Sequence, residues 1–323
     1  MRILWTGLLA ACAYLAPGSA SAQWPARIEI LPVSSQTVSG DGFLRGDTRG
    51  SEVVLGGELR LPLGAVVKVP AVILIHGSGG IGAGPDFWAR TLNDAGVAAF
   101  IMDSFSARGI VSTVEDQGQL NSLSMTVDAY RALDVLAKHP RIRADRIAVM
   151  GFSKGAVPAV YSAMDRFRAA YGGTAGNRFA AHIGFYTPCN VAYEGDTKVA
   201  PVPIRLFHGI SDDYVNVVPC RAYVARLKQT GVDVSLTEYP DSQHGFDSPT
   251  TPALFAVPRA QSTRNCTLKE AANGQVVDAA TGQPFDVKTS PCVAIGAHVG
   301  HNVEATEQVR VAVLAFVNDV LTK

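Results

Sequence analysis

Short apolar runs alternate with longer segments of helical periodicity through most of the chain. Residues 26–62 hold two extended segments, Arg27–Leu31 and Glu52–Leu61, which predict an antiparallel leading edge. From Val69–Ile75 onward the runs are continuously apolar, which is typical of strands buried on both faces of a sheet. Further strands are expected at Val97–Met102, Arg146–Met150, Phe179–Tyr186, Ile204–Phe207 and Val234–Glu238.

Amphipathic helices are expected between these strands, so the chain predicts an α/β fold. The central sheet should be mostly parallel and covered by helices on both faces, which makes a three-layer sandwich. Pro158 removes a backbone donor just past the first turn of one helix, and a local distortion is expected there. The helices are expected near Phe87–Ala95, Ser122–Lys138, Ala156–Tyr171, Val217–Gln229 and Val303–Leu321.

Residues 248–301 interrupt the last connection between a strand and a helix. The segment is rich in Pro, Thr, Asn and Gly and contains Cys266 and Cys292. A connection of this length without clear periodicity is unusual inside a compact domain. We expect it to fold over the surface, either as a binding lid or as decoration.

The length of 323 residues suits one large α/β domain or two small ones. Lysine plus arginine and aspartate plus glutamate are balanced at 28 each, so no strong field favours nucleic acid or an anionic membrane surface. The expected partner is a small molecule.

The N-terminus has the pattern of a targeting segment. Arg2 precedes the apolar run Ile3–Ala16, and small residues then lead to a cleavage site before Gln23. We expect a signal peptide at residues 1–22 and a single mature domain at 23–323, exported to the periplasm or secreted. The alternative is a lipoprotein anchored through Cys12, although the apolar region ahead of that cysteine is very short.

Export changes how the cysteines are interpreted, because an oxidising compartment favours disulfides. Four cysteines remain after cleavage and allow three pairings. We favour Cys189 with Cys220 and Cys266 with Cys292, since each pair would link neighbouring loops. No C-x-x-C spacing supports metal binding, and neither a metal nor a cofactor is expected.

The pentad Gly151–Gly155 carries the strongest chemical signal. It lies between a predicted strand and a predicted helix, and Ser153 is flanked by glycine two residues to either side. A serine on a strained strand-to-helix turn needs small neighbours and presents its hydroxyl above the sheet. Ser153 is therefore the candidate nucleophile.

A serine nucleophile needs a base and a group that orients the base. Asp212 and Asp213 follow one predicted strand and His244 follows the next, in the order serine, acid, histidine. The spacing from Gly209 and to Val215 favours Asp212 over Asp213. His298 and His301 are the competing histidines, but they follow no predicted strand and are expected to be surface or structural residues.

The loop His76–Gly80, directly after an early strand, is suited to bind a developing oxyanion through backbone N–H groups. The two donors are assigned to Ser78 and to Lys154, the residue after the serine, with Gly79 as the alternative to Ser78. His76 and His208 flank strand ends and are expected to make backbone hydrogen bonds.

Taken together, these motifs resemble the dienelactone hydrolase family of α/β-hydrolases. The likeness extends over roughly residues 50–250, and it implies a nucleophile at Ser153, an acid at Asp212 and a base at His244. The best-known members have cysteine in place of Ser153. The matching stretches are His76–Gly80, Asp103–Gly109, Gly151–Gly155, Asp212–Asp213 with Cys220, and His244–Asp247.

Gly79, Phe105, Arg108 and Tyr214 are candidates for contacting the substrate, although Arg108 could instead brace its loop by pairing with Asp103. The expected function is an exported serine hydrolase that cleaves carboxylic esters or lactones through an acyl-enzyme. Two alternatives remain: a peptidase of the prolyl-oligopeptidase type, and a catalytically silent hydrolase fold that serves as a binding protein of the cell envelope.

Overall fold

An eight-stranded sheet forms the centre of the molecule. The computed structural model describes residues 27–65, 67–173 and 176–323, so the predicted signal peptide and Cys12 lie outside the described residues. The strand order is β1-β2-β4-β3-β5-β6-β8-β9. The strands are β1 (Ile28–Thr37), β2 (Ser51–Arg60), β3 (Val69–Ile75), β4 (Ala98–Asp103), β5 (Ile142–Phe152), β6 (His182–Phe185), β8 (Ile204–Gly209) and β9 (Val234–Tyr239).

The predicted fold class is confirmed. β1 and β2 pair antiparallel, and β2 joins the sheet by antiparallel pairing with β4. Every later neighbour in the sheet is parallel. Because the carboxyl ends of the parallel strands share one edge, the loops that follow them meet there.

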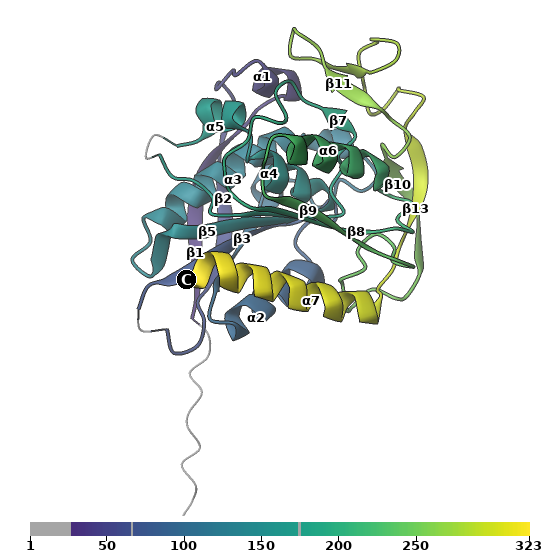
Figure 1. The fold of residues 1–323 in the computed structure, drawn as a ribbon. Coiled ribbons are helices and arrows are strands. Elements are labelled where there is room, and N and C mark those ends of the chain that lie inside the picture. Colours follow the sequence, from purple (N-terminus) through teal and green to yellow (C-terminus); the bar gives the residue numbers. More distant parts are fainter. Residues whose placement is uncertain (1–26, 66, 174–175) are drawn as a thin grey trace, which may run out of the picture.

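Side chains of β3 show why its sequence is apolar throughout. Ile73 and Ile75 belong to one hydrophobic cluster, and Val72 and Leu74 belong to another on the opposite face. Figure 1 shows α2 and α7 on one side of the sheet and α3, α4 and α6 on the other. The helices are α1 (Gly40–Leu44), α2 (Ala83–Asp94), α3 (Ser122–Ala137), α4 (Ala156–Tyr161), α5 (Asp165–Tyr171), α6 (Val218–Gln229) and α7 (Val303–Val317), which continues as a short π-helical turn at Asn318–Thr322.

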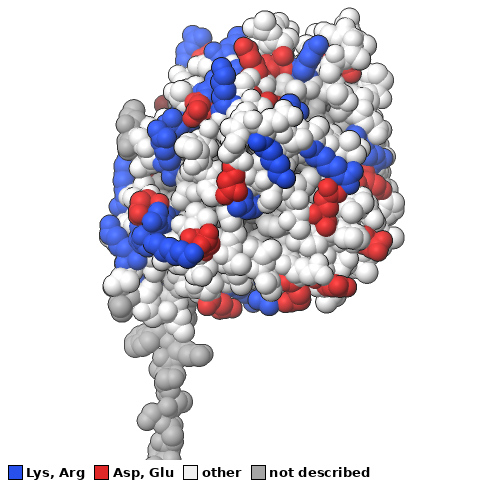
Figure 2. Space-filling model, viewed as in Figure 1, with Lys and Arg blue, Asp and Glu red and all other residues white. Residues whose placement is uncertain are grey.

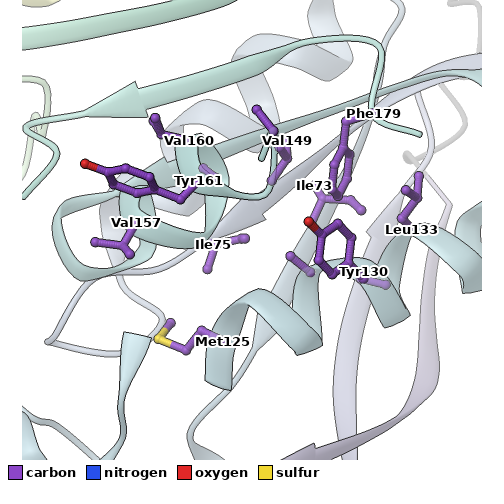
Figure 3. Packing of buried hydrophobic residues seen from close by; sticks show 14 of the residues in the cluster. Ile73, Ile75, Met125, Tyr130, Leu133, Val149, Val157, Val160, Tyr161 and Phe179 are labelled. Carbon is purple, nitrogen blue, oxygen red and sulfur yellow. The ribbon is translucent and has the colours of Figure 1, made fainter. Parts of the chain in front are cut away.

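Packing between α3, α4 and the sheet stabilises one face of the core. Tyr130 and Leu133 of α3 lie among the buried side chains of β3 and β5, and Val157 and Val160 of α4 extend the same cluster (Figure 3). Fully burying an aliphatic side chain of this size contributes about 1.5–3 kcal/mol. This face therefore fixes the helix that follows Ser153.

The helix expected at Ala156–Tyr171 is divided in two, which corrects the prediction. Met164 leaves the helical conformation with ψ at 127° and forms a bridge with Val199. Pro158, where a distortion was expected, lies inside α4, which has 6 residues and follows a 3-10 turn at Ser153–Gly155. The apolar spacing continues through the break, so the sequence pattern alone did not reveal it.

Residues 248–301, here called the excursion, contain their own strands. β10 (Phe255–Ser262) pairs with β13 (Ala294–Val299), and β11 (Leu268–Glu270) pairs with β12 (Val276–Asp278) and, in parallel, with β7 (Val191–Ala192). In Figure 1 these strands lie beyond one end of the main sheet. The excursion is thus held to the domain by backbone pairing.

Two disulfides are present with the expected pairing. Cys189 bonds Cys220 across 31 residues, and Cys266 bonds Cys292 across 26. Closing a loop of that length removes chain entropy from the unfolded state and typically contributes about 3 kcal/mol. The second disulfide closes the excursion on itself, as the cysteine positions predicted.

Charges of both signs are scattered over the face drawn in Figure 2, with large uncharged areas between them. Within the described residues, none of the helices combines the length and apolar character that crossing a membrane requires. The surface view agrees with the balanced composition.

Candidate active site

Ser153 occupies a strained turn at the end of β5. Its backbone φ is 53°, a value that non-glycine residues rarely adopt. A Cβ on Gly151 would lie 2.0 Å from the carbonyl oxygen of Gly155, and a Cβ on Gly155 would lie 2.3 Å from the carbonyl oxygens of Ile75 and His76. Both glycines are therefore required by close backbone approach, and the turn matches the predicted nucleophile elbow.

His244 lies between Ser153 and Asp212. Its Nε2 is 2.9 Å from the Ser153 Oγ, and its Nδ1 is 2.8 Å from the Asp212 Oδ2. An ionised carboxylate only accepts, so Nδ1 carries the proton and donates to Asp212, which leaves Nε2 free to accept from the serine hydroxyl. The three residues come from loops that follow β5, β8 and β9.

Asp212 is held as a buried carboxylate. Its Oδ1 accepts from the backbone N–H groups of Tyr214 and Val215, each at 2.8 Å. Burial alone would raise the pKa of Asp212, but the charge on His244 and the hydrogen bonds from His208 and His244 outweigh burial and hold that pKa well below its usual range. The carboxylate can therefore orient His244 and stabilise its protonated form.

Asp213 faces a different histidine. Its Oδ2 lies 2.8 Å from the His298 Nδ1, and its Oδ1 accepts from the His298 backbone N–H at 2.7 Å. The two adjacent acids are thus separated: Asp212 contacts His244, and Asp213 holds β13 of the excursion. The backbone directly after β13 also reaches the His244 loop, because the N–H of Gly300 donates to the His244 carbonyl oxygen at 3.0 Å.

The loop His76–Gly80 lies against the serine turn. A Cβ on Gly77 would be 3.1 Å from the Phe152 carbonyl oxygen and 3.3 Å from the Ser153 Cβ. His76 braces the loop, since its Nδ1 lies 2.8 Å from the Gly77 carbonyl oxygen and its Nε2 accepts from the Ser104 N–H at 3.2 Å. Burial lowers the pKa of His76, in keeping with a neutral ring that both donates and accepts.

The side chain of Lys154 turns to a polar partner away from the serine. Its Nζ donates to the Gln117 carbonyl oxygen at 2.9 Å and to the Gln117 Oε1 at 3.2 Å. Burial lowers the pKa of Lys154 to about 7. The Ser153 hydroxyl contacts His244 instead, which disfavours a serine–lysine pair.

Of the four candidates for substrate contact, only Tyr214 lines the cavity beside Ser153. Arg108 pairs with Asp128 at 2.8 Å, with the two side chains 6% and 1% exposed, so it braces the core, although not through Asp103. Phe105 is buried against His76, with ring centroids 4.4 Å apart. Gly79 lies within the loop His76–Gly80 but is not part of the cavity wall, whereas Tyr214 is.

A cavity of about 470 Å³ opens beside Ser153. Its wall combines apolar side chains of the main domain with side chains of the excursion, so the excursion shapes the space next to the serine. Of the two roles considered for this segment, a cover over the site fits the lining better than decoration. Representative wall residues are Ser78, Leu123, Val157, Tyr214, Leu268 and Phe285.

Two residues near the site were missed by sequence reasoning. The ring of Tyr186 lies 4.5 Å from that of His244, and its hydroxyl donates to Asp247 at 3.0 Å. Gln117 bonds the side chains of both Ser78 and Lys154. Tyr186 directly follows a strand at the carboxyl edge of the sheet, which is a usable signal, but Gln117 lies in a loop with no motif.

The fold, with serine, histidine and aspartate on loops at one edge of its sheet, defines the class of protein. The chain has the α/β-hydrolase fold. Residues 105–251 match the phospholipase/carboxylesterase family. This match supports the resemblance to dienelactone hydrolases and identifies the chain as a hydrolase of the carboxylic ester class.

Solved structures share the fold at low sequence identity. A dienelactone hydrolase-like promiscuous phosphotriesterase from metagenomic libraries is 18% identical, with a TM-score of 0.58 over 91% of this chain and 98% of that chain. An esterase from the Planctomycetes species Thermogutta terrifontis, with propionate bound, is 16% identical, with a TM-score of 0.50 over 70% of this chain and 86% of that chain. No curated protein matches the sequence.

Proposed function

We propose that this protein is an exported serine hydrolase that cleaves carboxylic esters or lactones through an acyl-enzyme. The observation that carries the proposal is the continuous hydrogen-bonded series from Ser153 through His244 to Asp212, which opens on the cavity. An activated serine beside a cavity whose wall mixes apolar and polar side chains suits a carbonyl substrate such as an ester or lactone.

In the first half of the reaction, Ser153 Oγ attacks the carbonyl carbon while His244 Nε2 takes the hydroxyl proton. The negative charge that develops on the carbonyl oxygen is stabilised by the backbone N–H groups of Ser78 and Lys154. Collapse of the tetrahedral adduct breaks the bond to the alcohol oxygen, which receives the proton from His244. In a lactone the alcohol stays attached to the acyl group.

In the second half, water attacks the acyl-serine. His244 takes a proton from the water and returns it to Ser153 Oγ, which restores the free hydroxyl and releases the acid. Asp212 holds the imidazole in the required tautomer and stabilises its charged form at both steps. Removing one oxyanion donor in such a site typically costs about 2.7–4 kcal/mol of transition-state stabilisation.

Export is the second part of the proposal. Cleavage of residues 1–22 would release a mature domain that starts near Gln23, in the periplasm or outside the cell. The two disulfides support this location, because disulfides persist in oxidising compartments. N-terminal sequencing of protein recovered from the periplasm or medium tests it, and a first residue of Met1 would contradict it.

A fluorophosphonate probe tests the nucleophile directly. Wild-type protein should be labelled at Ser153 and should hydrolyse short p-nitrophenyl esters, while Ser153→Ala should lose both properties. Ser162→Ala, at another buried serine of the same region, is the matched control and should keep both. A silent binding protein would not label, and a peptidase would label but would prefer peptides cut after proline.

A panel of aryl esters, alkyl esters of graded chain length and lactones should then define the substrate class. Activity should also decline as pH falls through the range in which histidines gain a proton, about 5–8. A rate that stays constant across that range would contradict a histidine base.

A further inference from the structure

We propose that Gln117 is a positioning residue that ties together the two halves of the oxyanion hole. The inference rests on the proposed function and deepens it, because it names the group that holds the two donor-bearing residues in place. Gln117 lies in a 3-10 turn, Gln117–Gln119, outside every motif that predicted the site.

One side of this bridge is the loop of Ser78. The Ser78 hydroxyl donates to the Gln117 Oε1 at 3.0 Å. The Ser78 carbonyl oxygen is held by the N–H of Thr113 at 2.8 Å. Thr113 and Gln117 belong to the same segment, so this segment holds both the side chain and the carbonyl group of Ser78.

The other side of the bridge is Lys154. Its buried Nζ donates both to the Gln117 carbonyl oxygen and to the same Oε1 that Ser78 contacts. Asp116, the acid next to this pair in sequence, is engaged by Lys288 at 3.2 Å. One oxygen atom of Gln117 therefore connects Ser78 to the residue that follows the candidate nucleophile.

The excursion fixes the orientation of Gln117 itself. The Gln117 N–H donates to the Gln261 Oε1 at 2.7 Å, and the Gln261 N–H donates to the Val114 carbonyl oxygen at 2.8 Å. Gln261 in turn donates through Nε2 to the Val287 carbonyl oxygen at 2.9 Å. The network runs from Ser78 through Gln117 into the excursion.

The proposed role of the Gln117 bridge is to preorganise the two oxyanion donors. Oxyanion donors accelerate a reaction because they are already aimed at the developing charge, and they lose effect when their spacing drifts. A bridge between the residues that carry both donors limits that drift. Loss of the bridge should lower kcat and leave KM nearly unchanged, because the donors act mainly on the transition state.

The test compares Gln117→Leu with Gln117→Glu. Leucine removes the Oε1 acceptor, and we expect kcat to fall by about 10–100-fold, less than the loss of a whole donor, with KM within about threefold. Glutamate keeps an oxygen at the Oε1 position and should restore kcat to within about threefold of wild type. Inhibition by a trifluoromethyl ketone, which forms a tetrahedral adduct, should weaken in Gln117→Leu by the same factor as kcat/KM.

Gln119→Leu is the matched control. Gln119 is exposed on the same short turn, and among the described residues its side chain hydrogen-bonds only to the Ser112 and Asp116 carbonyl oxygens. This variant should keep wild-type kcat. If Gln117→Leu does not fold, Ser78→Ala supplies the test, since it removes the same hydrogen bond from the other side and keeps the Ser78 N–H.

The outcomes separate this inference from the proposed function. If Ser153→Ala retains activity, the proposed function fails. If Ser153→Ala is inactive while Gln117→Leu or Ser78→Ala keeps wild-type kcat and inhibitor affinity, only the bridge is overturned. Two other outcomes also contradict a role in positioning the donors. In one, kcat falls in Gln117→Leu and is not restored in Gln117→Glu. In the other, Gln117→Leu raises KM and leaves kcat unchanged.

Discussion

The ring of Tyr186 packs 4.5 Å from the imidazole of His244, and the Tyr186 backbone lies in the left-handed region at a φ of 38°. A non-glycine residue in that region costs on the order of 1–3 kcal/mol and persists only where its surroundings determine it. Asp247 helps to hold Tyr186 in this conformation. Its carboxylate accepts a hydrogen bond from the Tyr186 hydroxyl at 3.0 Å and another from the Trp88 Nε1 at 2.7 Å.

Tyr186→Phe should destabilise the fold more than it impairs catalysis. Asp247 is buried, and burial raises its pKa even though Trp88 and Tyr186 donate to it. Losing one donor leaves a buried carboxylate oxygen unsatisfied, so the free energy of unfolding should fall by about 1–3 kcal/mol. The phenyl ring still covers His244, so kcat should change by less than about threefold.

Urea denaturation of the Tyr186→Phe variant at two pH values provides the measurement. A carboxyl with a raised folded-state pKa binds more protons folded than unfolded, so stability declines as pH rises from the unfolded-state pKa through the folded-state pKa. Removing the donor raises the folded-state pKa further, so the decline should extend to higher pH and become larger. Tyr239→Phe, at a buried tyrosine that packs on Phe246, is the control, and equal losses in the two variants would refute the role of Asp247.

Comparing Asp212→Asn with Asp213→Asn should show which of the two neighbouring acids orients His244. Because an amide can present its N–H to His244 or hold the wrong tautomer, kcat should fall in Asp212→Asn by roughly 10³–10⁴-fold, as is typical of such triads. Asp213→Asn leaves the His244 contact intact and should lower kcat by less than about tenfold. Steady-state kinetics on one aryl ester decides the assignment, and a larger loss in Asp213→Asn would reverse it.

The sheet and the three catalytic candidates could be predicted because local signals mark them. A strand buried on both faces must be apolar along its length, as β3 is, and Gly151 and Gly155 are imposed by backbone contacts within a single strand-turn-helix unit. Asp212 and His244 each follow a strand, so chain order alone places them at one edge.

The rest of the site depends on contacts between residues distant in sequence. Gln117 reaches the site because its loop packs on Lys154 and Gln261. Arg108 follows a strand as a substrate-binding arginine would, yet its partner Asp128 sits on α3. No spacing rule in one sequence records such pairings, so the sequence suggested a bracing role for Arg108 but named Asp103 as its partner instead of Asp128.

Arg108→Met should destabilise the protein without changing how it binds substrate. The ion pair with Asp128 is almost fully buried, and removing one partner of a buried pair costs about 3–5 kcal/mol because the remaining charge is uncompensated. Thermal and urea unfolding should show this loss, while KM for the folded fraction stays within about twofold. Arg108→Met combined with Asp128→Leu should recover part of the stability, and a raised KM in the single variant would restore the substrate-binding assignment.

Lys154 should make the stability of the protein depend on pH in the alkaline range. Burial lowers its pKa from 10.5 to about 7, so between those values the unfolded chain binds more protons than the folded chain. The free energy of unfolding therefore rises as pH increases from about 7 towards 10.5, and the contribution from Lys154 is on the order of a few kcal/mol.

Lys154→Met removes the titrating group and keeps the backbone N–H assigned to the oxyanion hole. Relative to wild type, this variant should be stabilised most at about pH 6.5 and least at about pH 9.5, because only the wild type must neutralise or bury a charge at the lower pH. Urea denaturation at several pH values measures the difference, with Lys228→Met, an exposed lysine of α6, as control. A difference that does not vary with pH would mean that Lys154 keeps its charge in the folded protein, held by the oxygens of Gln117.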